Sequence, residues 1–353
     1  MPNLLPDYCP TLAIRPAEMR GLEELPSASK AAIRPIFLFA PWVGSKSLDS
    51  TWERIEKSYG SRDYFLDLDD DYSSNATRQA VVDFNYMRSP EGLESYYNAV
   101  ESHPHAIPVV RFSQDGVISK EYQLERIIGL RRGCLLRITR DRLSTSTMND
   151  LKEIIEWGVG GYVLNIDYCW TNDLNSAELW FANILERLRS WGITVPIILT
   201  STDFPRGFTG YEGVSPVPIG SRIVYANLAR RYNSLQLVYG DWATTKPRDD
   251  SMGSLPAPRI DYPTGSEWII VRKPDDWDFP EVAKNLRNSR FWSDEPLIWG
   301  KKKIMAASKY GDDGLSTAAQ NVAARVNIHL FMQAELSSPL SPGALEEPWP
   351  EDL

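Results

Sequence analysis

Cysteine and histidine are scarce in this sequence. The 353 residues include three Cys and three His. Cys9, Cys134 and Cys169 lie far apart and form no Cys-x-x-Cys pair, so their spacing argues against both a disulfide framework and a zinc site. We expect three free thiols in a reducing cytoplasm.

Long apolar runs and long basic runs are also missing. No stretch reaches the roughly 18 apolar residues that span a bilayer, and residues 1–16 lack the basic and apolar segments of a signal peptide. The net charge is −9 and the longest basic run is Lys301–Lys303, whereas nucleic-acid-binding proteins usually carry a basic face. These absences predict a cytoplasmic protein that contacts neither membranes nor bulk nucleic acid.

Several enzyme motifs are absent as well. No Gly-x-Gly-x-x-Gly follows the first apolar run, and the loop at 308–314 lacks the spacing of a Walker A motif. His103 and His105 precede the fourth apolar run, and His329 falls in a predicted helix with apolar flanks. A histidine-rich metal site, or a Ser-His-Asp triad built on Ser201, therefore lacks a well-placed histidine.

The chain does contain a regular alternation of apolar runs with helical patterns. Eight short runs alternate with amphipathic segments, which is typical of a parallel sheet buried on both faces. Since eight strands can close into a barrel, we predict one (β/α)8 TIM-type barrel, with an open doubly wound sheet as the alternative. The runs are 9–14, 33–40, 64–68, 106–112, 133–139, 161–166, 195–200 and 235–238.

The composition changes after the last of these runs. Residues 243–265 are rich in Pro, Gly, Ser and Asp, which predicts a long irregular loop. An extra strand is expected at Trp268–Val271, and the Pro-rich, acidic end of the chain is typical of disorder. The predicted organisation is a barrel over 1–242, an extension packed on it over 243–335 with helices near 279–287 and 316–334, and a disordered tail over 336–353.

Short motifs are spread over about residues 8–334. They are Tyr8-x-Pro10-x-Leu12, Arg15-x-Ala17-Glu18, Pro35-Ile36-Phe37, Phe65-Leu66-Asp67, Ile107-Pro108-Val109, Thr202-Asp203-Phe204-Pro205, Val238-Tyr239-Gly240-Asp241-Trp242 and Arg325-Val326-Asn327-Ile328-His329. Together they resemble the beta protein family of phages and prophages. One departure is Trp242, where the family pattern leads us to expect Tyr.

This resemblance carries expectations about fold and setting rather than about a reaction. Members of the family look like (β/α)8 barrels and lie in mobile-element gene clusters linked to phage defence or to toxin–antitoxin-like modules. The resemblance thus implies a protein partner encoded nearby or a small anionic ligand.

In TIM barrels the working residues lie at the C-terminal ends of the strands and in the loops that follow. At these positions the candidate catalytic residues are Asp67, Asp167 and Asp241. The candidate ligand-binding residues are Arg15, Glu18, Trp42, Arg111, Arg137, Tyr239, Trp242, Arg259 and Arg272.

Strand alternation places Asp67 on the inner face of its strand together with Phe65. A buried carboxylate needs a partner, so Asp67, Arg137 and Asp167 are expected to converge at the barrel mouth. They could satisfy one another in a structural polar layer. They could instead provide acid/base groups or bind a divalent cation, with arginines holding an anion. Asp241 follows a glycine that permits close approach of a ligand or of backbone.

Two functions remain open at this stage. The first is a partner-binding or anion-binding component of a phage-related defence or toxin–antitoxin-like module, with Arg259 and Arg272 in a basic lid over the mouth. The second is a hydrolase of a phosphorylated or glycosidic small molecule that uses Asp67, Asp167 and Asp241. The cofactor, if one exists, is not specified by the sequence.

Overall fold

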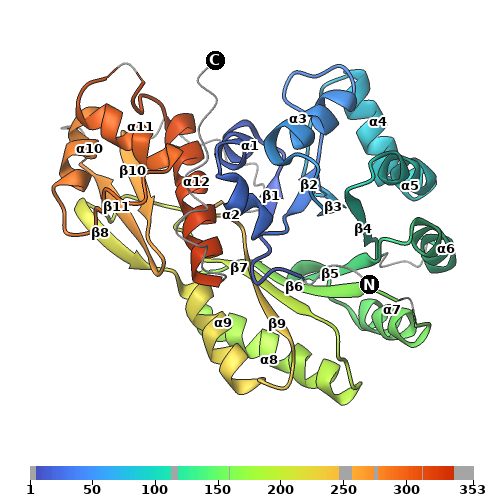
Figure 1. Cartoon of the computed structure of the whole chain (residues 1–353). Helices are drawn as coiled ribbons and strands as arrows, with labels where there is room; N and C mark the ends of the chain where they lie inside the picture. The colour runs from blue at the N-terminus through green and yellow to red at the C-terminus, as the bar shows by residue number, and fades with distance from the viewer. Residues whose placement is uncertain are drawn as a thin grey trace.

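The computed structural model describes residues 5–112, 118–158, 160–245, 257–273, 277–311 and 313–337. Figure 1 shows most strands toward the centre with helices around them, and a smaller group of strands at the left beside C-terminal helices. The strands are β1 (Thr11–Ala13), β2 (Ile36–Phe39), β3 (Tyr64–Leu68), β4 (Ala106–Val110), β5 (Cys134–Thr139), β6 (Tyr162–Trp170), β7 (Ile197–Thr202), β8 (Gly213–Pro218), β9 (Leu237–Asp241), β10 (Arg259–Pro263) and β11 (Glu267–Arg272).

Twelve α-helices and two short 3-10 helices connect these strands within the described residues. The helices are α1 (Pro16–Glu23), α2 (Ser27–Ala31), α3 (Asp49–Tyr59), α4 (Gln79–Arg88), η1 (Pro90–Gly92), α5 (Leu93–Ser102), α6 (Lys120–Leu130), η2 (Arg140–Arg142), α7 (Thr145–Glu156), α8 (Leu174–Ser190), α9 (Gly220–Arg231), α10 (Phe279–Arg287), α11 (Trp299–Ser308) and α12 (Ala318–Ser337). None of them is both long and apolar enough to cross a membrane.

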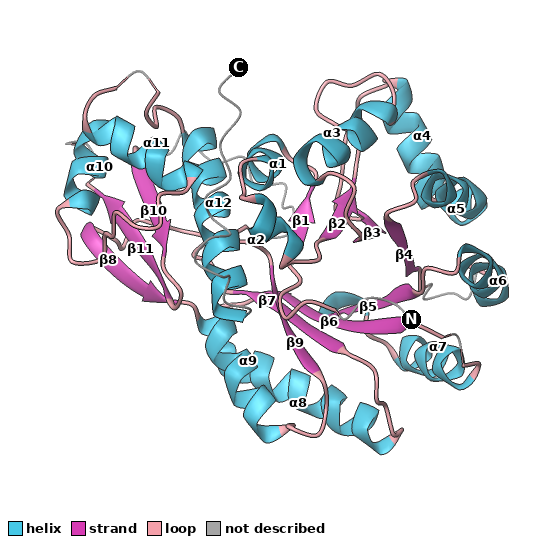
Figure 2. Cartoon of the chain, in the orientation of Figure 1, coloured by secondary structure: helices cyan, strands magenta, loops and turns pink. Residues whose placement is uncertain are grey.

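Eight strands pair side by side in parallel, in the order β1-β2-β3-β4-β5-β6-β7-β9. Their two faces carry different side chains because successive residues of a strand point to opposite sides. Phe65, Leu135 and Ile198 belong to a small apolar cluster on the inner, concave face. Leu66 and Leu136 belong to the large core between the strands and the surrounding helices. Figure 2 shows these helices on the outer side of the strands.

The prediction of a single closed (β/α)8 barrel is wrong. The two outer strands, β1 and β9, share one bridge between Tyr8 and Tyr239 and no ladder. The backbone N–H of Cys9 donates to the Tyr239 carbonyl at 2.9 Å. β1 has only three residues, and Ala243 and Thr244 adopt positive φ of 45° and 68° directly after β9. The two outer strands therefore meet at a single bridge, and no continuous ladder closes the sheet.

The remaining three strands form a separate antiparallel sheet in the order β10-β11-β8. The extra strand predicted at Trp268–Val271 is confirmed as the centre of β11. β8 is not among the predicted strands. It contains Pro216 and Pro218 and lies at the sheet edge, where proline is tolerated. β10 lies within the segment that was predicted to be an irregular loop.

Helix α12 packs against α1, beside the eight-stranded sheet, and against β10 of the antiparallel sheet, and it thereby joins these two parts of the structure. Its Asn327 side chain accepts a hydrogen bond from the Gly300 N–H of α11 at 2.9 Å and donates one to the Gly21 carbonyl of α1 at 3.0 Å. Both glycines lie where a side chain would collide with α12. A Cβ atom on Gly21 would sit 2.7 Å from the Ala323 carbonyl oxygen. The close packing of three helices thus depends on two residues without side chains.

Of the predicted tail 336–353, only residues 336–337 are described, as the end of α12.

We predict that Gly21→Ala lowers the free energy of unfolding by about 1–3 kcal/mol, because it overpacks the contact between α1 and α12. The measurement is urea unfolding followed by circular dichroism. Gly129→Ala in α6 is the matched control, since its Cβ would meet nothing within 4 Å, and it should be neutral or stabilising by up to about 1 kcal/mol. Equal effects of the two substitutions would contradict the packing argument.

Candidate functional site

The centre of the candidate site is one arginine held between two carboxylates. Arg137 of β5 donates from Nη1 to Asp67 Oδ2 and from Nη2 to Asp167 Oδ2, both at 2.7 Å. Asp67 is the next-to-last residue of β3 and Asp167 lies on β6, so the three side chains meet toward the carboxyl ends of the parallel strands. The predicted convergence of these three residues is therefore present.

Backbone and indole N–H groups complete the coordination of both carboxylates. Asp67 Oδ1 accepts from the Leu68 N–H at 2.9 Å. Asp167 Oδ1 accepts from the Cys169 N–H at 2.8 Å and from the Trp242 indole at 3.2 Å. Cys169 has a φ of 64°, a conformation that costs a non-glycine residue free energy, and it lies where the pairing of β6 with β7 is irregular, between Asp167 and Trp170. The strained residue near the end of β6 is thus also a hydrogen-bond donor to Asp167.

The side chains of Asp67 and Asp167 differ in solvent exposure. The Asp167 side chain is fully buried, whereas the Asp67 side chain is 12% exposed. Burial opposes the charge on Arg137, but the carboxylates of Asp167 and Asp67 outweigh it and raise the pKa of the guanidinium above its usual range. The Trp242 ring lies 5.8 Å from that guanidinium. A ligand entering from solvent can therefore reach Asp67 more readily than Asp167.

An arginine-rich recess opens beside the trio. It has a volume of about 290 Å³ and is lined by Asp70, Arg88, Arg111, Phe112, Arg142 and Thr147. A smaller pocket of about 40 Å³ shares five of these residues and extends to Asp67 and Arg137. The recess thus leads from the surface to the accessible side of the trio. We name it the arginine recess.

Asp70 holds two of these arginines in place. Its carboxylate accepts from Arg111 Nη2 at 3.1 Å through Oδ1 and from Arg142 Nη1 through Oδ2. Arg88 donates to the Asp70 carbonyl at 3.1 Å, and its own carbonyl accepts from Arg111 Nη1 at 2.9 Å. Two of the three guanidinium groups therefore contact the Asp70 carboxylate, and the third, that of Arg88, contacts the backbone carbonyl of the same residue.

Helices α6 and α7 fix the chain that carries these arginines. Gln123 of α6 accepts from the Arg111 N–H at 2.9 Å and donates to the Arg111 carbonyl at 3.0 Å. The Thr147 hydroxyl of α7 donates to the Arg142 carbonyl at 3.0 Å, and the Ser144 hydroxyl caps α7 by accepting from the Thr147 N–H. The recess is therefore built on anchored backbone.

Asp241 lies in a different, fully enclosed cluster. It accepts from the hydroxyls of Tyr8 at 2.7 Å and Tyr239 at 3.0 Å, and it contacts His329 Nε2 at 2.7 Å. Burial raises the pKa of Asp241, but the His329 ring and the other hydrogen bonds reverse this effect and hold it below its usual value. The contact ties β9 to α12. Asp241 is therefore paired with the buried His329 and does not line the arginine recess.

The other predicted residues occupy separate positions. Glu18 accepts from the Ala13 N–H at 2.8 Å and pairs with Arg15 at 3.4 Å. The Trp42 ring lies 5.1 Å from the Arg54 guanidinium. None of these residues lines the arginine recess. Of the predicted lid residues, Arg259 pairs with Asp261 at 2.7 Å and Arg272 donates to the Phe208 carbonyl.

Of the six residues that line the recess, sequence reasoning selected only Arg111. It did not select Asp70, Arg88, Phe112, Arg142 or Thr147. Arg88 lies at the end of α4 and Arg142 in η2, so neither ends a strand. Only a systematic inspection of the loop after each strand would have found Arg142. Within the described part of the chain, no three His, Cys, Asp or Glu side chains are grouped so that they could hold a metal ion.

The fold and the site together define a mixed α/β protein with a charged cluster at the carboxyl ends of parallel strands. The model of the Beta protein family matches residues 8–335, so the chain belongs to this family. Protein beta of Enterobacteria phage P4 is 24% identical over 353 residues, which cover 95% of each chain.

We predict that Arg137→Met destabilises the fold by about 3–5 kcal/mol, because it leaves two buried carboxylates without their cation. Urea unfolding measures the loss. Adding Asp67→Asn and Asp167→Asn to this variant should recover part of it. Arg126→Met on α6, whose partner Glu101 has a side chain 64% exposed, is the control and should change stability by less than about 1 kcal/mol. An equal loss in the control would refute the central role of Arg137.

The Asp241 cluster predicts a pH effect with a definite sign. Since the folded-state pKa of Asp241 is lowered from 3.8, its carboxylate stabilises the fold above about pH 4, and this stabilisation is lost as the pH falls through the folded-state value. Asp241→Asn should therefore be less stable than the wild type at pH 6, and the difference should shrink at pH 3. A difference that widens on acidification would have the wrong sign.

Proposed function

We propose that this beta-family protein binds a small phosphate-bearing anion in the arginine recess. The observation that carries the proposal is that Arg88, Arg111 and Arg142 line one recess together and all contact Asp70. The residues that line the recess include three guanidinium groups and one carboxylate. Arginine suits this task because its planar fork donates two parallel hydrogen bonds to phosphate or carboxylate oxygens.

Asp70 occupies the position that a ligand anion would take. Its two carboxylate oxygens already accept from Arg111 and Arg142, so a ligand must compete with an internal anion. This competition makes the recess selective for ligands with more charge than one carboxylate, such as a phosphomonoester. Phe112 lines the same recess and offers an apolar surface beside the charged groups.

The biological setting that we propose is a phage-defence or toxin–antitoxin-like module in the cytoplasm. The family membership supports the link to phages, and the resemblance of the motifs supports the link to such modules. In this proposal the bound anion controls contact with a partner encoded nearby. Phage plating on cells that carry the wild type or Arg111→Ala, with the neighbouring genes present, tests the setting separately from binding.

We predict that inorganic pyrophosphate binds the wild-type chain and that Arg111→Ala weakens this binding at least about tenfold, because a charge-assisted hydrogen bond contributes roughly 1.5–3 kcal/mol. Isothermal titration calorimetry at fixed, low salt measures the affinity. Asp70→Asn should instead strengthen binding, because it removes the competing charge while it keeps the shape of the side chain.

Arg189→Ala on α8 is the matched control, since its side chain is 56% exposed and pairs with Glu186. It should leave the affinity unchanged. Weaker binding in Asp70→Asn, or equal binding in Arg111→Ala and the wild type, would contradict the proposal.

A hydrolase remains a second candidate because Asp67 lines the pocket beneath the recess. In that case Asp67 would act on a ligand that the arginines hold. Asp67→Asn separates the two proposals. Anion binding alone predicts that biological activity survives this substitution, and hydrolysis predicts that it is lost while pyrophosphate still binds.

A further inference from the structure

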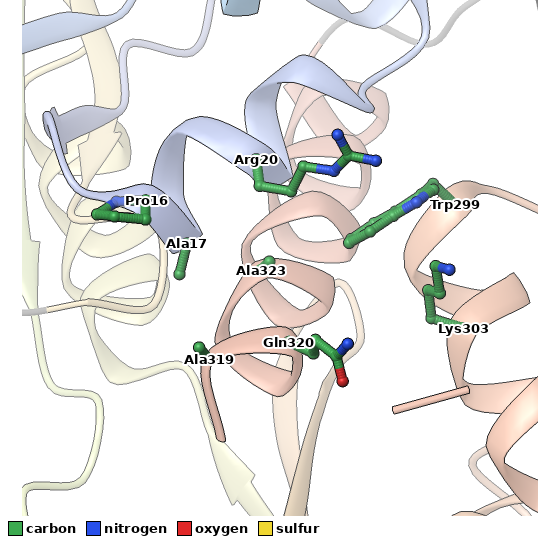
Figure 3. Close-up of a pocket in the computed structure, with 8 residues that line it drawn as sticks. All are labelled: Pro16, Ala17, Arg20, Trp299, Lys303, Ala319, Gln320 and Ala323. Atoms are coloured by element: carbon green, nitrogen blue, oxygen red, sulfur yellow. The ribbon is translucent and has the colours of Figure 1, made fainter. Parts of the chain in front are cut away.

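A second cavity lies on the far side of α1 from the strands, between α1, α11 and α12. It has a volume of about 280 Å³, and its walls include Ala17, Ala319, Ala323 and the Trp299 ring. Figure 3 shows Arg20 and Lys303 at its edge, with the Arg20 side chain directed toward Trp299. The cavity thus combines an apolar floor, one large aromatic ring and a basic rim.

We infer that this cavity is the docking site for the chain's own C-terminal segment, residues 338–353, with Trp349 as the inserted side chain. The segment follows α12, which supplies one wall of the cavity. The proposal is independent of anion binding in the arginine recess, because the two cavities share no residue.

The chemistry of the segment complements the cavity. Trp349 stands between Pro348 and Pro350, and acidic residues flank this triplet on both sides: Glu346, Glu347, Glu351 and Asp352. A tryptophan that fills a small apolar pocket, with charged groups outside it, is the usual form of a binding hot spot. The prolines reduce the number of conformations that the segment loses on docking.

The two basic residues at the edge of the cavity, Arg20 and Lys303, are only partly paired with acidic side chains. Lys303 is 3.9 Å from the Asp313 carboxylate, whose side chain is 97% exposed, and such surface pairs contribute little free energy. Arg20 contacts Glu24 at 2.5 Å, and its side chain is 45% exposed. Lys303 is therefore the cation that we expect to gain most from an acidic segment.

The segment is long enough to reach the cavity. Ala323 and Ser337 are 14 positions apart on α12, which corresponds to about 21 Å of helix. Trp349 follows Ser337 by 12 positions and can span up to about 40 Å when extended. The cavity is also slightly smaller than the roughly 300 Å³ at the lower end for drug-sized ligands, which favours a single aromatic side chain as its occupant.

The test is disulfide formation in the full chain. We introduce Ala319→Cys at the cavity edge and Pro350→Cys beside Trp349, and measure the rate of oxidation to an intramolecular disulfide by gel mobility. Docking predicts rapid cross-linking in this double variant. Adding Trp349→Ala should slow it roughly tenfold, because the anchoring side chain is lost, and adding Lys303→Glu should slow it severalfold. Trp349→Ala lies outside the described core and leaves the rest of the packing unchanged.

Lys309→Glu is the charge control, since Lys309 follows α11 but does not line the cavity, and it should leave the rate unchanged. Equal rates with and without Trp349 would overturn the proposal, because they would show random encounters of a tethered segment. Cross-linking between two chains instead of within one would also overturn it, in favour of a second copy as the occupant.

Discussion

The site depends on one guanidinium group that is shared by two carboxylates. Arg137 lies on β5. This strand pairs directly with β6, which carries Asp167, but β4 separates it from β3, which carries Asp67. An isolated charge in this position would be expensive, and two unpaired carboxylates more so. The pair of 2.7 Å contacts therefore couples strands that are not adjacent. This contact thus links the carboxyl-terminal parts of β3, β5 and β6.

Carboxylates farther from Arg137 are also held by several hydrogen-bond donors. Each carboxylate at a strand end is surrounded by donors from other elements: Asp70 by Arg111 and Arg142, Asp241 by two tyrosines and His329 of α12. The outcome differs with accessibility. Asp241 is sealed and serves the packing of α12, whereas Asp70 lies in a recess where an external anion could replace it. Accessibility, and not the type of residue, separates a structural carboxylate from one that could regulate binding.

Local sequence patterns predicted the parts of this protein that depend on neighbouring residues. Alternation placed Phe65 and Asp67 on the inner face of β3, and the structure confirms it. The glycine before Asp241 was expected to permit close approach. A Cβ there would sit 2.5 Å from the Thr200 hydroxyl and 3.1 Å from the Cys9 carbonyl. The glycine therefore permits close approach of neighbouring chain segments. Whether β1 and β9 form a ladder depends instead on residues more than 200 positions apart, and no local pattern records it. The edge strand β8 was hidden by its prolines for a comparable reason, since only its position in the sheet makes them tolerable.

The central claim is that Asp70 marks the position of an external anion. The most direct measurement is the structure of the chain crystallised with tungstate, whose heavy atom identifies a bound phosphate analogue by anomalous scattering. We predict tungstate between the guanidinium groups of Arg111 and Arg142, with the Asp70 side chain rotated away from them. Tungstate bound elsewhere, with both arginines still paired to Asp70, would contradict the account.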